Sequence, residues 1–390
     1  MIPYSRQSIN LFDVLSVSKQ LAFKSLTQGS TIEEFEAKIA EYVGARYAVS
    51  VSSATSGLHL AVLALELPVG SEIITSPISF VASSNAILYS GHRPNFVDIE
   101  RDTINIDVSL ISKELKSNQN IRAVIPVHFA GLPCDMRKLS EVVVTKGVKV
   151  IEDAAHAFGA RYSNGSRVGS CEHSDMTVFS FHPVKSITTG EGGVITTNSI
   201  ALYRKLLRLR SHGINKLDDS FESKLLSSTD GITNPWYYEM QELGYNYRLT
   251  EIQAALGISQ LQRINSFMAL RAKKVQTYRE YFSKSNFVRP AQIVYNESSA
   301  HHIFPLRINF ANTNISRAKL MILLKAKGIG SQVHYIPIPM HPFYQKLGYQ
   351  VENLPESLSY YFEGLSIPLY PNLKHFQQLK VIREINTLLK

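Results

Sequence analysis

Short apolar runs alternate with amphipathic stretches between about residues 30 and 200. A short apolar run bounded by turn residues predicts a buried strand, whereas apolar residues three or four positions apart predict a helix. Strands are predicted at residues 47–51, 73–75, 95–97, 123–127, 149–152, 177–181 and 193–197. Helices are predicted between several of them, at residues 55–67, 80–89 and 136–146. This alternation predicts an α/β fold with a mostly parallel, seven-stranded sheet covered on both faces.

The pattern changes after residue 245. Apolar positions at helical spacing predict one long helix over residues 249–283, with Thr250 as its N-cap. The rest of the chain predicts a smaller α+β unit, with strands at 303–308 and 331–335 and helices at 316–327 and 374–389. We therefore expect a large domain over residues 1–248, which includes an N-terminal segment, and a smaller C-terminal domain over residues 249–390. Residues 215–235 are polar and rich in turn residues, which predicts a long exposed excursion.

Composition narrows the class of protein. Apolar residues make up 44% of the 390 positions, enough for a sizeable core, and no run of 18 apolar residues suggests a membrane span. The N-terminus lacks the pattern of a signal peptide, so we expect a soluble, cytoplasmic protein. Cys134 and Cys171 stand outside any C-x-x-C pair, which favours buried, reduced thiols over zinc or redox chemistry.

The net charge of +9 is compatible with nucleic acid, an anionic membrane or a phosphorylated small molecule. The densest basic stretch, residues 204–210, has apolar residues at helical spacing and is typical of an amphipathic helix with a basic solvent face. We therefore expect no nucleic-acid or membrane partner.

One lysine lies in an unusual setting. The stretch FSFHPVKSITTGEGG, residues 179–193, places Lys185 between a strand-like apolar run and a glycine-rich turn, with no charged residue within five positions apart from His182. Apolar surroundings lower the pKa of an amine and make it nucleophilic near pH 7, as Schiff-base chemistry on an aldehyde requires. A structural lysine whose ammonium group reaches water is the alternative. The GEGG turn would let the backbone pass close to a ligand, or is a plain tight turn.

Three other stretches are candidates for binding, and ligands gather where strands end in open α/β sheets. Small hydroxylated residues follow the strand at 47–51 and open a helix, an arrangement that suits a phosphate but also ordinary N-capping. Asp153, at the end of the strand at 149–152, suits a basic ring nitrogen, with metal binding or helix capping as alternatives. Asn246 and Arg248 precede the long helix and would complete an anion site or merely cap and pack.

A phosphate cradle, an aspartate about one hundred residues later and a lysine about thirty beyond it occur in the order found in fold-type I pyridoxal-phosphate enzymes. The chain resembles the sugar-nucleotide aminotransferases of the DegT/DnrJ/EryC1/StrS family over nearly its whole length. The stretches that carry the resemblance are LTQGSTIEEFEAKIAEYVGARYAVSVSSATSGLHLA, EIITSPISFVASSNAILYSGHRPNFVDI, VIPVHFAG, VIEDAAHAFGA, FSFHPVKSITTGEGGVITTN, RSHGI and LGYNYRLTEIQAALGISQL. The chain departs from many relatives at Ser186 and Gly57, and neither change touches a reacting group.

The resemblance implies a role for each matching position. Lys185 matches the lysine that bonds to pyridoxal 5′-phosphate, and Asp153 matches the partner of its ring nitrogen. The other implied cofactor positions are Ala54, Thr55, Phe80, His156, Ser180 and Asn246. The implied substrate positions are Tyr4, Lys24, Ser25, Leu26, Thr27, Ala54, Ser180, Asn246, Gln332, Val333, His334 and Tyr335. No metal site is implied.

The resemblance also implies the reaction and the partners. L-Glutamate is the expected amino donor and a UDP-linked 4-keto-6-deoxy-N-acetylhexosamine the expected acceptor, in a homodimer in which Asn246 serves the neighbouring subunit's site. An aminotransferase for another keto sugar linked to dTDP, GDP or UDP is the main alternative. A sister dehydratase would carry histidine in place of Lys185. A DNA-binding relative without turnover would need clustered base-reading side chains, which the sequence does not show.

Overall fold

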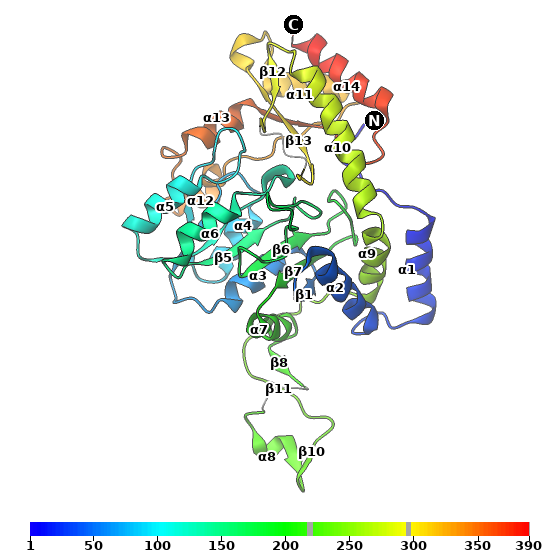
Figure 1. The fold of residues 1–390 in the computed structure, drawn as a ribbon, viewed down its shortest axis with the longest axis vertical. Helices are drawn as coiled ribbons and strands as arrows, with labels where there is room; N and C mark the ends of the chain where they lie inside the picture. Colours follow the sequence, from blue (N-terminus) through cyan, green and yellow to red (C-terminus); the bar gives the residue numbers. More distant parts are fainter. Residues whose placement is uncertain (217–220, 294–297, 390) are drawn as a thin grey trace.

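In a computed structural model, which describes residues 1–216, 221–293 and 298–389, a seven-stranded sheet lies at the centre of the chain (Figure 1). Its strand order is β1-β7-β6-β5-β4-β2-β3, and β7 runs antiparallel to both neighbours while the other pairs are parallel. The strands are β1 (Tyr47–Val51), β2 (Glu72–Thr75), β3 (Arg93–Phe96), β4 (Ile121–Ile125), β5 (Lys149–Asp153), β6 (Met176–Ser180) and β7 (Gly193–Thr197). The predicted mostly parallel sheet is confirmed, with shifts of one or two residues at most strand ends.

Helices cover both faces of this sheet because successive strand residues point to opposite sides. On β5, Val150 belongs to one core cluster and Ile151 to another. The first cluster includes residues of α2 (Ser30–Val43), α5 (Val108–Ser117) and α6 (Met136–Val144), and the second includes residues of α3 (Ala54–Ala64), α4 (Ala82–Tyr89) and α7 (Ile200–Arg210). The molecule is therefore a three-layer α/β/α structure at its centre.

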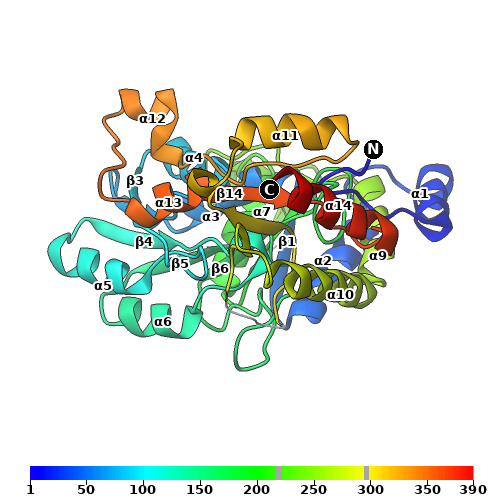
Figure 2. The ribbon, with the colours of Figure 1, turned by 90° about the horizontal axis from the view of Figure 1, so that it is seen from above.

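A second core lies at the upper end of the molecule in Figure 1, around a small antiparallel sheet. Its strands are β12 (Val288–Pro290), β13 (Phe304–Ile308) and β14 (Gly364–Ile367), and the helices α11 (Arg317–Ala326) and α14 (His375–Leu388) pack with them; Figure 2 shows both helices from above. The predicted strand at 331–335 is wrong. Only Gln332 of this segment pairs with the sheet, through an isolated bridge to Ser366 on the edge of β14 that faces away from β13.

The predicted long helix over 249–283 is two helices, α9 (Glu251–Leu261) and α10 (Ile264–Phe282). Thr250 caps α9 as predicted, since its side chain accepts a hydrogen bond from the Gln253 N–H. Residues near the start of α10 lie in the first core, whereas Val275 and Phe282 lie in the second, so this helix connects both cores. The division of the chain at residues 248 and 249 stays a prediction.

The polar stretch at 215–235 forms part of an arm that projects from the body of the molecule (Figure 1), and residues 217–220 of it lie outside the described residues. The described arm contains β8 (Ile214–Asn215), α8 (Lys224–Ser227), β9 (Ser228–Thr229), β10 (Ile232–Thr233) and β11 (Glu239–Met240). The remaining α-helices of the described chain are α1 (Leu11–Phe23), α12 (Pro342–Lys346) and α13 (Pro355–Glu363). The predicted exposed excursion is confirmed for the described part.

Two glycines let the elements around the candidate site approach one another. A Cβ atom at Gly193, in the GEGG turn, would lie 2.8 Å from the backbone of Ser53, Ala54 and Phe179. A Cβ atom at Gly57, in α3, would lie 2.9 Å from Val178 Cγ1. Glycine at 193 therefore brings β7 against the β1–α3 junction, and glycine at 57 lets α3 pack closely on the sheet.

None of the described helices is both long enough and apolar enough to cross a membrane.

Candidate functional site

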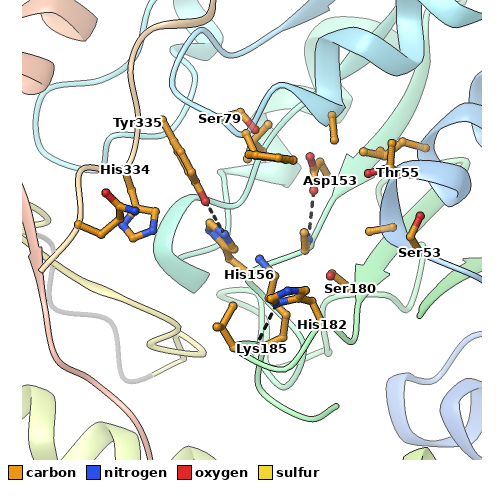
Figure 3. A pocket seen from close by; sticks show the side chains of 18 of the residues that line it. Ser53, Thr55, Ser79, Asp153, His156, Ser180, His182, Lys185, His334 and Tyr335 are labelled. Carbon is orange, nitrogen blue, oxygen red and sulfur yellow. Dashed lines mark hydrogen bonds between the residues drawn. The ribbon is translucent and has the colours of Figure 1, made fainter. Parts of the chain in front are cut away.

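A cavity of about 570 Å³ lies at the ends of β1, β5 and β6, and its far wall is the segment 332–335. Figure 3 shows Lys185, Asp153 and His156 around one space, with Thr55 on one side and Tyr335 on the other. The predicted residues that line this cavity are Tyr4, Ala54, Thr55, Phe80, Asp153, His156, Ser180, Lys185, Gln332, Val333, His334 and Tyr335. The structure therefore brings most of the residues predicted from the sequence together at a single site.

Lys185 supplies the amine of the cavity. Burial lowers its pKa from 10.5 to about 8, although the charge of Asp153 acts in the opposite direction. With this pKa roughly one amine in ten is neutral at pH 7, about 300-fold more than for an ordinary lysine. Lys185 forms no ion pair with any residue that the structure describes. The geometry thus provides a nucleophilic amine that can also accept and return a proton.

Asp153 ends β5 and is held by hydrogen bonds to both carboxylate oxygens. Its Oδ2 accepts from the Ser83 hydroxyl at 2.6 Å, and its Oδ1 accepts from the Ala155 N–H at 3.1 Å. Only 5% of Asp153 is exposed, so the carboxylate has a fixed position at the cavity wall. Ser83 comes from α4, 70 positions earlier in the chain, and sequence reasoning did not identify it.

The start of α3 provides donors for an anion. Ser53 is its N-cap, and its hydroxyl accepts from the Ser56 N–H at 3.1 Å. The N–H groups of Ala54 and Thr55 have no acceptor among the described residues, as is usual in the first turn of a helix. Because these groups line the cavity at the positive end of the helix, they fit a phosphate group.

His156 and Tyr335 form a pair on the opposite wall, with 3.1 Å between the Tyr335 hydroxyl and His156 Nε2. Burial, followed by the charges of Lys185 and His334, lowers the pKa of His156 well below its ordinary value. Burial likewise raises the pKa of Tyr335, so a neutral imidazole faces a protonated phenol. His156 Nδ1 is buried without a hydrogen-bond partner among the described residues. A buried nitrogen of this kind indicates a missing ligand atom or water.

Glu152, next to Asp153, points away from the cavity into the core. Its carboxylate accepts hydrogen bonds from His128, Tyr162, Ser174 and Thr177, at 2.5 to 2.9 Å. Burial raises the pKa of Glu152, but these hydrogen bonds and the charge of His128 outweigh it and lower the pKa. Glu152 therefore has no free oxygen for a ligand and stabilises the strand that carries Asp153.

Two predicted groups lie outside the cavity. Lys24, Ser25, Leu26 and Thr27 follow α1 on the surface, and Asn246 is exposed beside a bridge to Ser211. Further lining residues, to which the sequence assigned no individual role, are Ser53, Leu58, Ser79, Ala82, Val127, Ala155, His182, Val184 and Glu191. Several of them are next to predicted site residues in the sequence, and this proximity could have identified them.

The separate parts of the cavity complement one type of molecule. The helix terminus fits a phosphate, the Asp153 carboxylate fits a basic ring nitrogen, and the Lys185 amine fits an aldehyde. His156 offers a ring nitrogen to a further polar atom. The described residues thus fit a phosphorylated aromatic aldehyde with a ring nitrogen, and Cys134 and Cys171 are free, buried thiols outside this cavity.

Comparison with known proteins gives an independent view of the chain. The sequence model of the DegT/DnrJ/EryC1/StrS aminotransferase family matches residues 8–386. Over 383 residues the chain is 36% identical to the UDP-4-amino-4,6-dideoxy-N-acetyl-beta-L-altrosamine transaminase of Campylobacter jejuni, covering 97% of this chain and 96% of that protein. It is 34% identical to the spore coat polysaccharide biosynthesis protein SpsC of Bacillus subtilis, covering 100% of this chain and 97% of SpsC.

Solved structures are similar over the same length. Helicobacter pylori PseC, described as an aminotransferase in the biosynthesis of pseudoaminic acid, matches with a TM-score of 0.90 and 30% identity, covering 100% of this chain and 99% of PseC. The putative sugar aminotransferase Spr1654 from Streptococcus pneumoniae, in its PMP-form, matches with a TM-score of 0.88 and 28% identity, covering 100% of this chain and 99% of Spr1654. Its PLP-form matches with the same TM-score and identity, covering 99% and 98%.

Proposed function

Because the chain belongs to the DegT/DnrJ/EryC1/StrS aminotransferase family, we propose that it transfers an amino group from L-glutamate to C4 of a UDP-linked 4-keto-6-deoxy-N-acetylhexosamine. Membership of the family establishes the general activity: the chain is a nucleotide-sugar aminotransferase that uses pyridoxal 5′-phosphate. The proposed product is UDP-4-amino-4,6-dideoxy-N-acetyl-β-L-altrosamine, with 2-oxoglutarate as the second product. The observation that carries the chemistry is the amine of Lys185 facing the carboxylate of Asp153 across one cavity.

The described residues suggest how the cofactor would be held. Ala54 and Thr55 would bind its phosphate, Asp153 would pair with its ring nitrogen and Lys185 would bond to its aldehyde. Phe80 would stack on the ring, Ser180 would contact the cofactor, and His156 would lie beside the phenolic oxygen. When bound, pyridoxal 5′-phosphate supplies a group that takes up an amine and a ring that accepts the electron pair of a carbon losing its proton.

Lys185 performs the proton transfers in this proposal. In the first half of the reaction its neutral amine takes the proton from the α-carbon of L-glutamate, and in the second half it returns a proton to C4 of the sugar. When the cofactor is bound, the carboxylate of Asp153 would favour the protonated form of its ring nitrogen. A single base can serve both halves because the apolar surroundings hold its pKa near 8.

The substrate assignment rests on the segment at the far wall and on the relatives. Tyr4 and the residues Gln332–Tyr335 line the cavity opposite the cofactor positions, where a nucleotide sugar would lie. Both the altrosamine transaminase of Campylobacter jejuni and PseC are similar over almost the whole chain, which supports a UDP-linked 4-keto sugar. SpsC is similar to nearly the same degree, so the sugar has to be identified by assay.

Single-turnover incubation of the pyridoxamine form with UDP-, dTDP- and GDP-linked keto sugars tests this assignment. We expect the UDP-4-keto sugar whose amination gives the altro configuration to be converted fastest, with the product stereochemistry established by NMR. Clean conversion of another sugar, with none of this one, would refute the specific assignment and leave the aminotransferase activity in place.

We further propose that the enzyme is a homodimer with shared sites. Asn246 and the segment 24–27 are exposed and do not line the cavity of their own chain. Several large apolar side chains are also exposed on or near α1, including Phe12 (71%) and Phe23 (81%). Surface of this kind is typical of an interface, and in the proposed dimer Asn246 serves the cavity of the second chain.

Mixing two impaired variants tests whether sites are shared. Lys185→Ala and Asn246→Ala chains should each have little activity alone, but a mixed dimer has one site with both native residues. After subunit exchange we expect roughly one quarter of the native activity, because half of the dimers are mixed and one of their two sites is complete. Sedimentation as a monomer, or a mixture no more active than its components, would contradict the shared site.

A further inference from the structure

A second cavity, of about 270 Å³, lies where the small sheet meets the loop that follows β3. Three of its lining residues are arginines: Arg289 on β12, Arg307 on β13 and Arg101 on the loop. It shares no lining residue with the cavity that contains Lys185. We call it the arginine cavity.

The register of the small sheet sets two of these arginines side by side. Arg289 and Arg307 are directly opposite each other in the antiparallel pair of β12 and β13, so their side chains lie on the same face. Like charges directly opposite on a sheet are unfavourable unless something compensates them. Arg101 adds a third positive charge to the same cavity.

The guanidinium of Arg307 is almost without partners. Arg307 is 2% exposed, and its Nε, Nη1 and Nη2 atoms have no hydrogen-bond acceptor among the described residues. Its only ion pair among them is with Glu363, whose Oε2 is 3.6 Å from Nε, beyond hydrogen-bond distance. Buried arginines normally satisfy their five N–H donors, so this group indicates an absent acceptor.

The surrounding charges favour an anion as that acceptor. Among the described residues that line the cavity, Glu363 is the only carboxylate, against three guanidinium groups. Glu356 offsets part of the charge on Arg307 from outside the lining, whereas Arg289 and Arg101 act on Arg307 as positive charges. Ser285, Asn286 and Asn309 add neutral polar groups to the wall.

We propose that the arginine cavity binds a small oxyanion, such as a phosphate group. Guanidinium groups bind phosphate oxygens through paired N–H donors, and three of them from separate elements can surround one such group. A bound anion would compensate the facing charges of Arg289 and Arg307 and supply acceptors for the buried nitrogens.

The arginine cavity is connected to the catalytic cavity through one side chain. The Tyr360 ring centroid lies 5.7 Å from Arg307 Cζ, and the Tyr360 hydroxyl donates a hydrogen bond of 2.7 Å to the carbonyl oxygen of His334. His334 lines the catalytic cavity. One residue, Tyr360, therefore separates Arg307 from the wall of the catalytic cavity.

Calorimetric titration of the holoenzyme with inorganic phosphate, with ionic strength held constant by chloride, tests the proposal. We expect saturable binding of one phosphate per chain, weakened about tenfold by Arg101→Gln or by Arg289→Gln. Both arginines are at least partly exposed, so these variants should fold, and an Arg307 variant is not needed. Arg383→Gln, an exposed arginine on α14 outside the cavity, is the matched control and should bind as the native chain does.

Glycerol 3-phosphate in the same titration separates two sources of the phosphate group. Tighter binding of the ester than of inorganic phosphate would point to a phosphorylated metabolite, and the reverse order to the free ion. Either order supports the site if the double variant Arg101→Gln/Arg289→Gln loses the binding. Absence of saturable binding, or binding that the double variant retains, would overturn the proposal, and in the latter case would place phosphate elsewhere.

Discussion

Replacement of Lys185 by alanine is expected to lower turnover by at least about 10³-fold, because one residue supplies both the covalent bond to the cofactor and the proton transfers. The measurement is the absorbance change of the bound cofactor when L-glutamate is added, followed by the same reading with the keto sugar. Borohydride treatment and peptide mapping should place a pyridoxyl group on Lys185 in the native chain and on no residue in the variant.

Two controls separate lost chemistry from lost structure. Lys113→Ala removes an exposed lysine from α5 and should keep native turnover. Methylamine fits the space that the lysine side chain leaves and should restore part of the proton transfer in Lys185→Ala, which a misfolded protein would not allow. Appreciable turnover by Lys185→Ala without added amine would show that another group is the base.

Replacement of Asp153 by asparagine is expected to slow the half-reaction with L-glutamate by about 10² to 10⁴-fold, while the cofactor still binds. The amide has nearly the same shape as the carboxylate, and the Ser83 hydroxyl can still donate to its oxygen. What is lost is the negative charge that keeps a ring nitrogen protonated. Rapid-mixing absorbance gives the rate, and a pH titration of the absorbance of the bound cofactor reports the change in its protonation.

Ser83→Ala is the matched control for Asp153. This change removes one hydrogen bond to Oδ2 but leaves the carboxylate charge, so a loss of about 2- to 13-fold is expected, which corresponds to about 0.5 to 1.5 kcal/mol. If Asp153→Asn were no slower than Ser83→Ala, the charge of Asp153 would not be needed, and its role would be to position the ligand.

The large sheet could be predicted from the sequence because most of its strands contain a short apolar run with a clear end. The bounds of β1 and β7 agree with the prediction at both ends. The strands of the smaller core were harder to predict from the sequence, because they depend on which segments pair with β13. The segment 331–335 lies beside the outer edge of β14, and it pairs with that strand only through the bridge between Gln332 and Ser366.

The break between α9 and α10 also had no signal in the sequence. Arg263 has a non-helical backbone, with φ −108° and ψ 3°, yet neither glycine nor proline lies between Leu261 and Ile264. The turn lets α9 pack on α1 and α2 while α10 runs toward the second core. Only the tertiary structure therefore determines where the first helix ends.

The candidate site was predictable where its residues sit in local motifs. Asp153 ends a strand, while Lys185 and the start of α3 each follow one, and parallel strands bring their ends to one edge of a sheet. Ser83 was not predictable because it contacts Asp153 from a helix 70 positions away, and its own neighbours mark it only as one serine among several. The pairing of Tyr335 with His156 depends likewise on how the two cores are joined.

The helix α10 has a mechanical consequence for the enzyme. Its 19 residues include neither glycine nor proline, and they are anchored in the first core at Ile264 and Phe267 and in the second at Val275, Tyr278 and Phe282. An opening of the two cores relative to each other would require α10 to bend, and the helix contains no glycine or proline at which it would kink. We therefore expect a bulky nucleotide sugar to reach Lys185 through a preformed entrance, without a relative movement of the two cores.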